Sequence, residues 1–187
     1  MKIKDIASVL TGVYAKSALS GDAVYLQASM FNTCGELTFD IKPNVNLDNS
    51  TRRHLLEKGD VLLAAKGANN FAAEYNTLWG PAIASSTFII IKLMKKSEHA
   101  VEPAYITWYL NHPATQAYLK NQAKGSSMPS ISKQTVGELD IPVPTLERQQ
   151  QILHLQGLRD NERKIAQRLD MLREQFIQKQ LLIAAQQ

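Results

Sequence analysis

A long heptad pattern near the end of the sequence constrains the architecture more than any other feature. No proline follows Pro144, so one helix can run unbroken from Thr145 through the remaining residues of the 187-residue sequence. Its apolar side chains recur at alternating steps of three and four residues, the spacing of a coiled-coil seam. The seam consists of Leu155, Leu158, Ile165, Leu169, Leu172, Phe176 and Ile183, and is interrupted by Glu162 and Lys179.

A helix this long is too long to be covered by the rest of the chain. About 38 residues at roughly 1.5 Å each give about 57 Å, which is more than a domain built from the other residues can cover. We therefore expect the seam to pair with a second copy of the chain, as an antiparallel homodimer. The alternative is an amphipathic helix folded back onto its own domain.

The preceding part, residues 1–144, has the pattern of an α+β domain. Short runs rich in β-branched and aromatic residues, separated by glycine and proline, predict strands at 24–27, 37–41, 61–65 and 87–91. Helical spacing predicts two short helices within 103–123, the second starting at Pro113. The expected fold is a mostly-β domain with short helices (1–144), followed by a C-terminal coiled-coil helix (145–187).

The sequence contains no recognisable catalytic or cofactor-binding motif. His54, His99, His112 and His154 have no metal-ligand spacing, and neither a nucleotide-binding glycine loop nor a Gly-x-Ser-x-Gly sequence occurs. The Glu162-Arg163-Lys164 triplet lies within the expected long helix, without the second acidic partner that a nuclease needs. We expect no catalytic residue, no bound metal and no bound cofactor, although an enzyme with an unrecognised site remains an alternative.

Charge and hydropathy narrow the possible partners. The formal net charge of +4 favours an anionic partner. No apolar run reaches the roughly 18 to 20 residues that cross a bilayer, and the first residues lack the apolar core of a signal peptide. The expected location is therefore the cytoplasm, with no membrane partner.

One stretch carries a composite motif. It reads K-G-S-S-M-P-S-I-S-K-Q-T-V-G-E-L-D-I-P-V-P-T-L-E-R-Q-Q-Q-I from Lys124 to Ile152. It resembles the specificity subunits of type I restriction-modification enzymes, in which a glycine-containing loop, an Ile-Ser step and an Ile-Pro-x-Pro-x-x-x-x-Gln segment lead into a long spacer helix. The segment 6–12 is similar to the opening strand and turn of that family, and 59–67 to its Gly-Asp-(apolar)-Leu segment.

The resemblance implies a DNA-recognition module without an active site. Such subunits read a two-part DNA sequence and scaffold methyltransferase subunits, which use S-adenosylmethionine, and restriction subunits, which use ATP and Mg. Family members carry two recognition domains and two spacer helices, whereas this sequence has one of each, so it resembles a half-subunit that recognises one half-site. The alternative is a regulatory homologue that binds other subunits as a decoy without binding DNA.

Three polar loops are the expected DNA contacts. Phosphates are bound by lysines, hydroxyls and backbone amides, whereas bases are read by amides and aromatic edges. In the first loop the aromatic and basic side chains stand together, in the second two amides suited to adenine follow a lysine, and the third offers phosphate donors. The residues are Thr11, Tyr14 and Lys16; Lys66, Asn69 and Asn70; and Lys124, Ser126 and Ser127.

Overall fold

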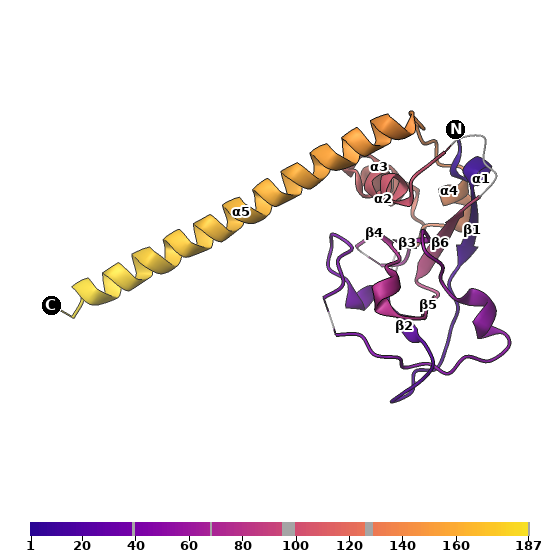
Figure 1. The fold of residues 1–187 in the computed structure, drawn as a ribbon, viewed down its shortest axis with the longest axis horizontal. Coiled ribbons are helices and arrows are strands. Elements are labelled where there is room, and N and C mark those ends of the chain that lie inside the picture. Colours follow the sequence, from indigo (N-terminus) through magenta and orange to yellow (C-terminus); the bar gives the residue numbers. More distant parts are fainter. Residues whose placement is uncertain (39, 68, 95–99, 126–128, 187) are drawn as a thin grey trace. The chain divides into compact units, whose positions relative to one another are not determined.

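The computed structural model describes residues 1–187 except 39, 68, 95–99, 126–128 and 187 (Figure 1). The chain divides into two compact units, Met1–Gln149 and Gln150–Gln187, which are described separately below. The first unit contains all the strands among the described residues, together with four short α-helices. The second unit is helical. A mostly-β domain with short helices and a long C-terminal helix confirms the expected fold class.

Most elements of the first unit are short. The strands are β1 (Ala7–Thr11), β2 (Val24–Leu26), β3 (Val61–Ala64), β4 (Ala72–Glu74), β5 (Ala82–Ala84) and β6 (Phe88–Leu93). The α-helices are α1 (Ile3–Ile6), α2 (Pro103–Asn111), α3 (Pro113–Gln122), α4 (Lys133–Gly137) and the long α5 (Leu146–Ala184). Three 3-10 helices are η1 (Ala28–Met30), η2 (Thr51–His54) and η3 (Thr77–Trp79).

Strand β6 is one of the two interior strands of the larger sheet, and it joins β1 to β3. The order is β1-β6-β3-β4, and every neighbouring pair is antiparallel. On one side Thr11 of β1 lies opposite Ile89, and on the other Ala64 of β3 lies opposite Phe88. The four residues Phe88–Ile91 are all buried, which explains the continuous apolar run of this segment.

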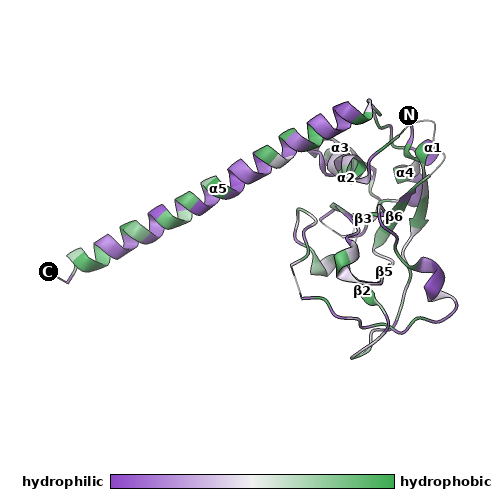
Figure 2. Cartoon of the chain, in the orientation of Figure 1, coloured by the Kyte–Doolittle hydropathy of each residue, from purple (hydrophilic) through white to green (hydrophobic). Residues whose placement is uncertain are grey.

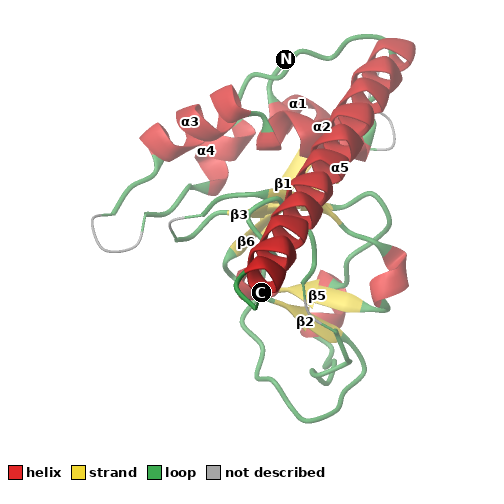
Figure 3. Cartoon of the chain, turned by 90° about the vertical axis from the view of Figure 1, so that its left-hand side faces the viewer, coloured by secondary structure: helices red, strands yellow, loops and turns green. Residues whose placement is uncertain are grey.

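A second, two-stranded parallel sheet pairs β2 with β5, and Figure 3 shows it as a separate pair of strands. An apolar core that includes residues of both sheets contains Phe31, Phe71 and Phe88. Phe31 and Phe71 each present an edge-to-face geometry to Phe88, with ring centroids 5.8 and 6.0 Å away. Such pairs contribute about 0.5–1.5 kcal/mol beyond their buried area.

Proline starts two of the helices, and the sequence predicts this start for the second of them, at Pro113. Pro103 is the first residue of α2 and Pro113 the first of α3, a position where the missing N–H has no intrahelical partner in any residue. Helix α2 buries Tyr105, Ile106 and Leu110 and packs against β3 and β4. Helix α2 therefore covers the β4 side of the larger sheet, and α3 packs against α2 and α4.

The turn before β3 depends on one glycine and one carboxylate. Gly59 has φ of +90°, a conformation that L side chains rarely adopt. Asp60 is buried, and its Oδ2 accepts from Glu57 N at 2.9 Å and from Lys92 Nζ at 3.0 Å. Because Lys92 belongs to β6, this ion pair fixes the turn before β3 to strand β6.

The extended segment before α5 is held by the beginning of the chain. Lys2 forms a β-bridge with Asp140, and Ile3 N donates to Leu139 O at 3.1 Å. Lys2 and Lys4 both donate to the carboxylate of Glu138, and these two hydrogen bonds lower the pKa of Glu138 from 4.5 to about 2. The extended segment before α5 is thus held against the start of the chain and α1.

The first turn of α5 is fixed by two polar side chains. Thr145 Oγ1 accepts from Arg148 N at 3.4 Å, which makes Thr145 the expected N-cap. The side chain of Gln149 is fully buried, and its Oε1 accepts from Glu102 N at 2.9 Å. Its Nε2 donates to Ala100 O and Pro144 O, each at 2.9 Å. Gln149 is the glutamine of the composite motif, and its role is to join this turn to the segment before α2.

The structure corrects the expected strand at 37–41. Among its described residues none lies in a strand, and Leu37 forms only an isolated bridge with Phe31. The backbone is instead satisfied locally, since Thr38 N donates to Met30 O at 2.9 Å and Asn32 Oδ1 accepts from the amides of Cys34 and Glu36. The apolar periodicity there reflects packing of Leu37 on the core, without a neighbouring strand. Strands β4 and β5 and helix α4 were not predicted.

We predict that Gln149→Leu lowers the free energy of unfolding of the first unit by about 2–4 kcal/mol, because a buried amide N–H and two carbonyls lose their partners. Chemical denaturation followed by tryptophan fluorescence measures the change. The matched control is Gln134→Leu on the exposed surface of α4, where we expect a change below about 0.5 kcal/mol. Equal effects of the two substitutions would contradict the role assigned to Gln149.

Candidate nucleic-acid interface

The expected DNA-contacting loops leave the same end of the larger sheet. The register places the last residues of β1 and β3, Thr11 and Ala64, beside the first residues of β6 and β4, Phe88 and Ala72. The connecting segments at this end are therefore 12–16, 65–71 and 85–87. A pairing order that the sequence does not reveal thus brings the first two expected loops to one surface.

The first loop presents an aromatic side chain outward. Tyr25 from β2 holds both neighbours of Tyr14: its hydroxyl donates to Val13 O at 3.0 Å and accepts from Ala15 N at 3.3 Å. Between these two fixed points the Tyr14 side chain is 83% exposed. Lys16 is exposed as well. The loop backbone is therefore held in place while the Tyr14 ring and the Lys16 ammonium group, which do not pack on the core, stay accessible to a ligand.

Hollows of about 460 and 530 Å³ lie on either side of this loop. Both are lined by Tyr14 and Lys16, and the larger one also by Ser85, Ser86 and Thr87 from the segment before β6. Thr11 itself is the last residue of β1, exposed at the base of the loop. Sequence reasoning did not include the hydroxyls of 85–87, although their position directly before a buried strand was readable.

The two asparagines of the second loop differ in burial and in hydrogen bonding. Asn70 is half-buried, and its Nδ2 donates to Ala64 O at 2.8 Å across the base of the loop. Asn111, at the end of α2, fixes Ala72 by accepting from its N at 2.7 Å and donating to its O at 2.8 Å. Asn69 is exposed. The structure therefore leaves Asn69 free to turn toward a ligand and gives Asn70 a structural bond.

The third loop is joined to the second by a short ladder. Ser130 forms antiparallel bridges with both Lys66 and Lys124, and it exchanges backbone hydrogen bonds of 3.0 and 2.9 Å with Lys124. Gly67 N also donates to Pro129 O at 3.0 Å. Residues directly opposite each other in such a ladder point to the same face. Lys66 and Lys124 therefore lie on one face, about 10 Å apart at two strand spacings.

The two lysines are exposed, and within the described residues neither forms an ion pair. Two unpaired ammonium groups at this separation suit a surface of repeated negative charges such as a phosphate backbone. Ser126 and Ser127, the remaining expected contacts of this loop, lie outside the described residues.

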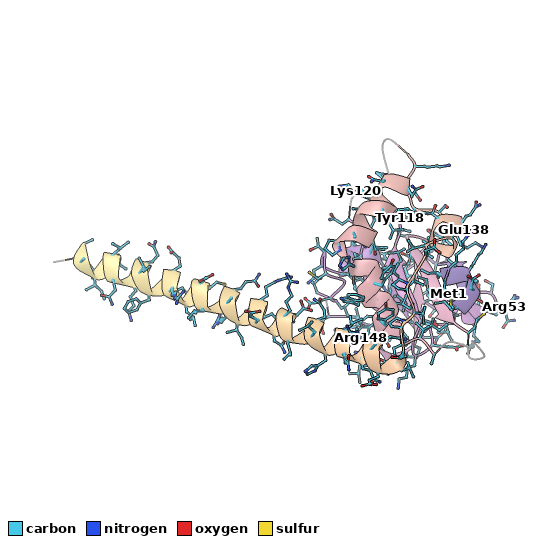
Figure 4. All side chains as sticks on the ribbon, turned by 90° about the horizontal axis from the view of Figure 1, so that it is seen from above. Met1, Arg53, Tyr118, Lys120, Glu138 and Arg148 are labelled. Atoms are coloured by element: carbon cyan, nitrogen blue, oxygen red, sulfur yellow. The ribbon has the colours of Figure 1, made fainter. Side chains whose placement is uncertain are left out.

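Helix α3 contributes side chains that the sequence analysis missed. Gln116 and Lys120, one helical turn apart, line a shallow pocket of about 240 Å³ together with Thr33, Asn69 and Asn70. Figure 4 labels Lys120 and Tyr118 on this helix. The i,i+4 spacing of Gln116 and Lys120, opposite buried Thr115 and Leu119, is the signal that could have identified them.

Within the described ranges no group of three or more histidine, cysteine or acidic side chains is arranged to hold a metal ion. None of the helices that the structure describes is long and apolar enough to cross a bilayer.

The seam of α5 is unpaired in the single chain. All seven expected dimer residues are exposed, from 42% for Ile183 to 70% for Ile165. Figure 2 shows apolar and polar residues alternating along the whole of α5, and Figure 4 shows side chains leaving it on all sides. The other seam residues are Leu155, Leu158, Leu169, Leu172 and Phe176. An apolar stripe of this length is typical of a helix that packs against a partner.

The chain thus combines a mostly-β domain, whose polar loops lie at one end of its larger sheet, with a long helix that carries an exposed apolar seam. The chain belongs to the family of type I restriction modification DNA specificity domains, whose sequence model matches residues 1–174. This confirms the resemblance noted in the sequence. Specificity subunits are the non-catalytic components of restriction-modification systems.

Individual relatives agree with the family assignment. Over 107 residues, 57% of the chain, it is 32% identical to the specificity subunit of the type I restriction enzyme MjaVIII of Methanocaldococcus jannaschii. The HsdS subunit of Thermoanaerobacter tengcongensis matches 87% of the chain with a TM-score of 0.60 and 14% identity. The type I S subunit of M. genitalium matches 86% with a TM-score of 0.56 and 13% identity.

These relatives are longer than the chain. It spans 23% of the MjaVIII subunit, 37% of the T. tengcongensis subunit and 38% of the M. genitalium subunit. At such low identity the two structures establish the shared fold alone.

We predict that Gly12→Ala displaces the first loop and destabilises the first unit by about 1–3 kcal/mol. A Cβ at this position would lie 2.1 Å from Ser85 O and 2.5 Å from Ala84 O, both backbone atoms that cannot move aside. Thermal unfolding measures the loss. The matched control is Gly137→Ala, also buried, where the new Cβ meets only Lys4 Cβ at 3.6 Å. A neutral Gly12→Ala would contradict this close approach.

Proposed function

We propose that the chain is a sequence-specific DNA-binding specificity subunit of a type I restriction-modification system, acting in the cytoplasm. Residues 1–144 form the target-recognition domain, which reads one half-site, and residues 145–187 form the spacer and dimerisation helix. The observation that carries the proposal is the convergence of the polar loops on one end of the sheet. Family membership supports DNA as the ligand.

The loops divide the work of DNA binding. Lys66 and Lys124 hold phosphates, because both residues are exposed, lie on one face of the ladder and have no ion-pair partner in the part of the chain that the structure describes. Tyr14 and Asn69 reach bases, because both side chains are exposed, and the backbone on either side of Tyr14 is held by the Tyr25 hydroxyl. Lys16 adds a phosphate contact next to Tyr14.

The helix pairs two copies of the chain. An antiparallel homodimer through α5 buries the exposed seam at about 25 cal/mol per Å² of apolar surface. The dimer scaffolds methyltransferase subunits, which bind S-adenosylmethionine, and restriction subunits, which use ATP and Mg; the chain itself binds none of these. Two identical recognition domains related by a two-fold axis read the same half-site on opposite strands, so the target is an interrupted palindrome.

Selection of bound sites from a random DNA pool tests the proposal. The full chain is used alone and together with a co-expressed methyltransferase subunit of the same system, and we expect an interrupted palindrome in at least one of the two selections. Selections that both return no sequence, while the methyltransferase subunit still binds the chain, would instead support a regulatory decoy.

We predict that Lys124→Ala weakens binding to all DNA sequences alike and lowers the slope of log affinity against log salt concentration by about 0.9, the value for one lost phosphate contact. Fluorescence anisotropy on the selected site and on a scrambled site measures both effects. The matched control is Lys4→Ala. Lys4 lies in α1, which precedes β1 at the end of the sheet away from the loops, so we expect an unchanged slope. A loss confined to the selected site would show that Lys124 reads bases.

We predict that Leu169→Asp with Leu172→Asp yields a folded monomer. The pair of chains loses four buried leucines, each contributing about 1.5–3 kcal/mol to association. Sedimentation velocity measures the mass. The matched control is Met171→Asp, an apolar residue that is 52% exposed and lies off the seam, and this variant should remain dimeric. A monomer for the unmodified chain, or for the Met171 variant as well, would contradict the seam assignment.

A further inference from the structure

The shallow pocket between the β3–β4 loop and α3 has an unusual donor and acceptor pattern. It is lined by Thr33, Asn69, Asn70, Gln116, Ala117 and Lys120, with three amides, one ammonium and no carboxylate. Its volume, about 240 Å³, is below the roughly 300–1,000 Å³ of sites for free small molecules. The pocket therefore suits a part of a polymer, such as the edge of one base.

Two of the amides are held in a single orientation. Asn70 Nδ2 donates to Ala64 O at 2.8 Å, and Gln116 Nε2 donates to Leu110 O at 2.7 Å. A carbonyl oxygen only accepts hydrogen bonds, so in each pair the NH₂ end must face the backbone. Among the described residues neither Asn70 Oδ1 nor Gln116 Oε1 has a hydrogen-bond partner. Both residues therefore offer a fixed acceptor.

Fixed acceptors select for a donor on the ligand. A phosphate group carries only acceptors toward a protein and would face two carbonyl oxygens, whereas the exocyclic amino group of adenine or cytosine donates from the major groove. Thymine and guanine present carbonyl oxygens at the corresponding position. Lys120 is exposed and, within the part of the chain that the structure describes, forms no ion pair. Its ammonium group can therefore donate to N7 when the base in the pocket is a purine.

We propose that this pocket determines specificity at one base pair of the target, by accepting a hydrogen bond from the exocyclic amino group of adenine or cytosine. Gln116 and Asn70 supply the acceptors, and Lys120 favours adenine because adenine carries N7 beside its amino group. The proposal rests on the proposed function, and it adds two residues of α3, Gln116 and Lys120, to a surface otherwise made of loops.

Base analogues test the proposal without changing the protein. In the site selected by the unmodified full chain, with the methyltransferase subunit present where it is needed, each adenine is replaced by purine and each cytosine by 2-pyrimidinone, both of which lack the amino group. We expect one position per half-site at which binding weakens roughly 10-fold. Whether that position holds adenine or cytosine identifies the source of the amino group.

A substitution then assigns the contact. With Gln116→Met, the same analogue should cause no further loss, because the acceptor is already gone. The matched control Gln122→Met changes an exposed glutamine at the end of α3 that does not line the pocket, and it should retain the full 10-fold response. Thermal unfolding is measured for both glutamine variants and for Lys120→Met, which serves as a second pocket variant. An unchanged melting temperature shows that a weaker response comes from the lost contact and not from a lost fold.

The outcomes distinguish the two proposals. If the unmodified chain selects no DNA sequence, the proposed function fails and the pocket has no base to read. If it selects a sequence but no analogue weakens binding, or Gln116→Met keeps the full response, only the assignment of this pocket is overturned.

Discussion

The backbone hydrogen bonds on both sides of β6 are the constraint on which the rest of the structure depends. This strand is buried along Phe88–Ile91 and pairs antiparallel with β1 on one side and with β3, which is itself buried along its whole length, on the other. Its register decides which strand ends lie together. The gathering of 12–16, 65–71 and 85–87 on one surface follows from this pairing.

The sequence predicted the elements that have a strong local cause. Pro103 and Pro113 start helices, Gly59 requires a turn, and the seam specifies the long helix. It did not predict β4 or β5, whose alanine-rich segments 72–74 and 82–84 have little intrinsic strand preference. Pairing with β3 and β2 creates those strands. Local hydrogen bonds to Met30 O and Asn32 Oδ1 explain why the described residues of 37–41 do not form a strand.

The candidate site was predictable in part, for a related reason. Polar loops are visible in a sequence, but their proximity depends on strand order. The bond of Asn70 Nδ2 to Ala64 O, which fixes the orientation of this amide, also depends on the folded backbone and cannot be predicted from the pattern Lys66 to Asn70. Gln116 was missed because the search was confined to polar loops, whereas its i,i+4 spacing with Lys120 lies within a helix. Buried side chains that bond to the backbone, such as Tyr25, position the exposed loop residues, and this role cannot be read from the sequence.

The clamp around Tyr14 has a consequence for how such a surface can diverge. Tyr25 holds Val13 and Ala15 through their backbone atoms, so the side chain between them contributes nothing to the anchoring. Position 14 can therefore change its chemistry while the loop keeps its path. A scaffold of this kind tolerates substitution at the exposed position and not at the residues just beneath it, so single substitutions can change the surface chemistry while the fold stays stable.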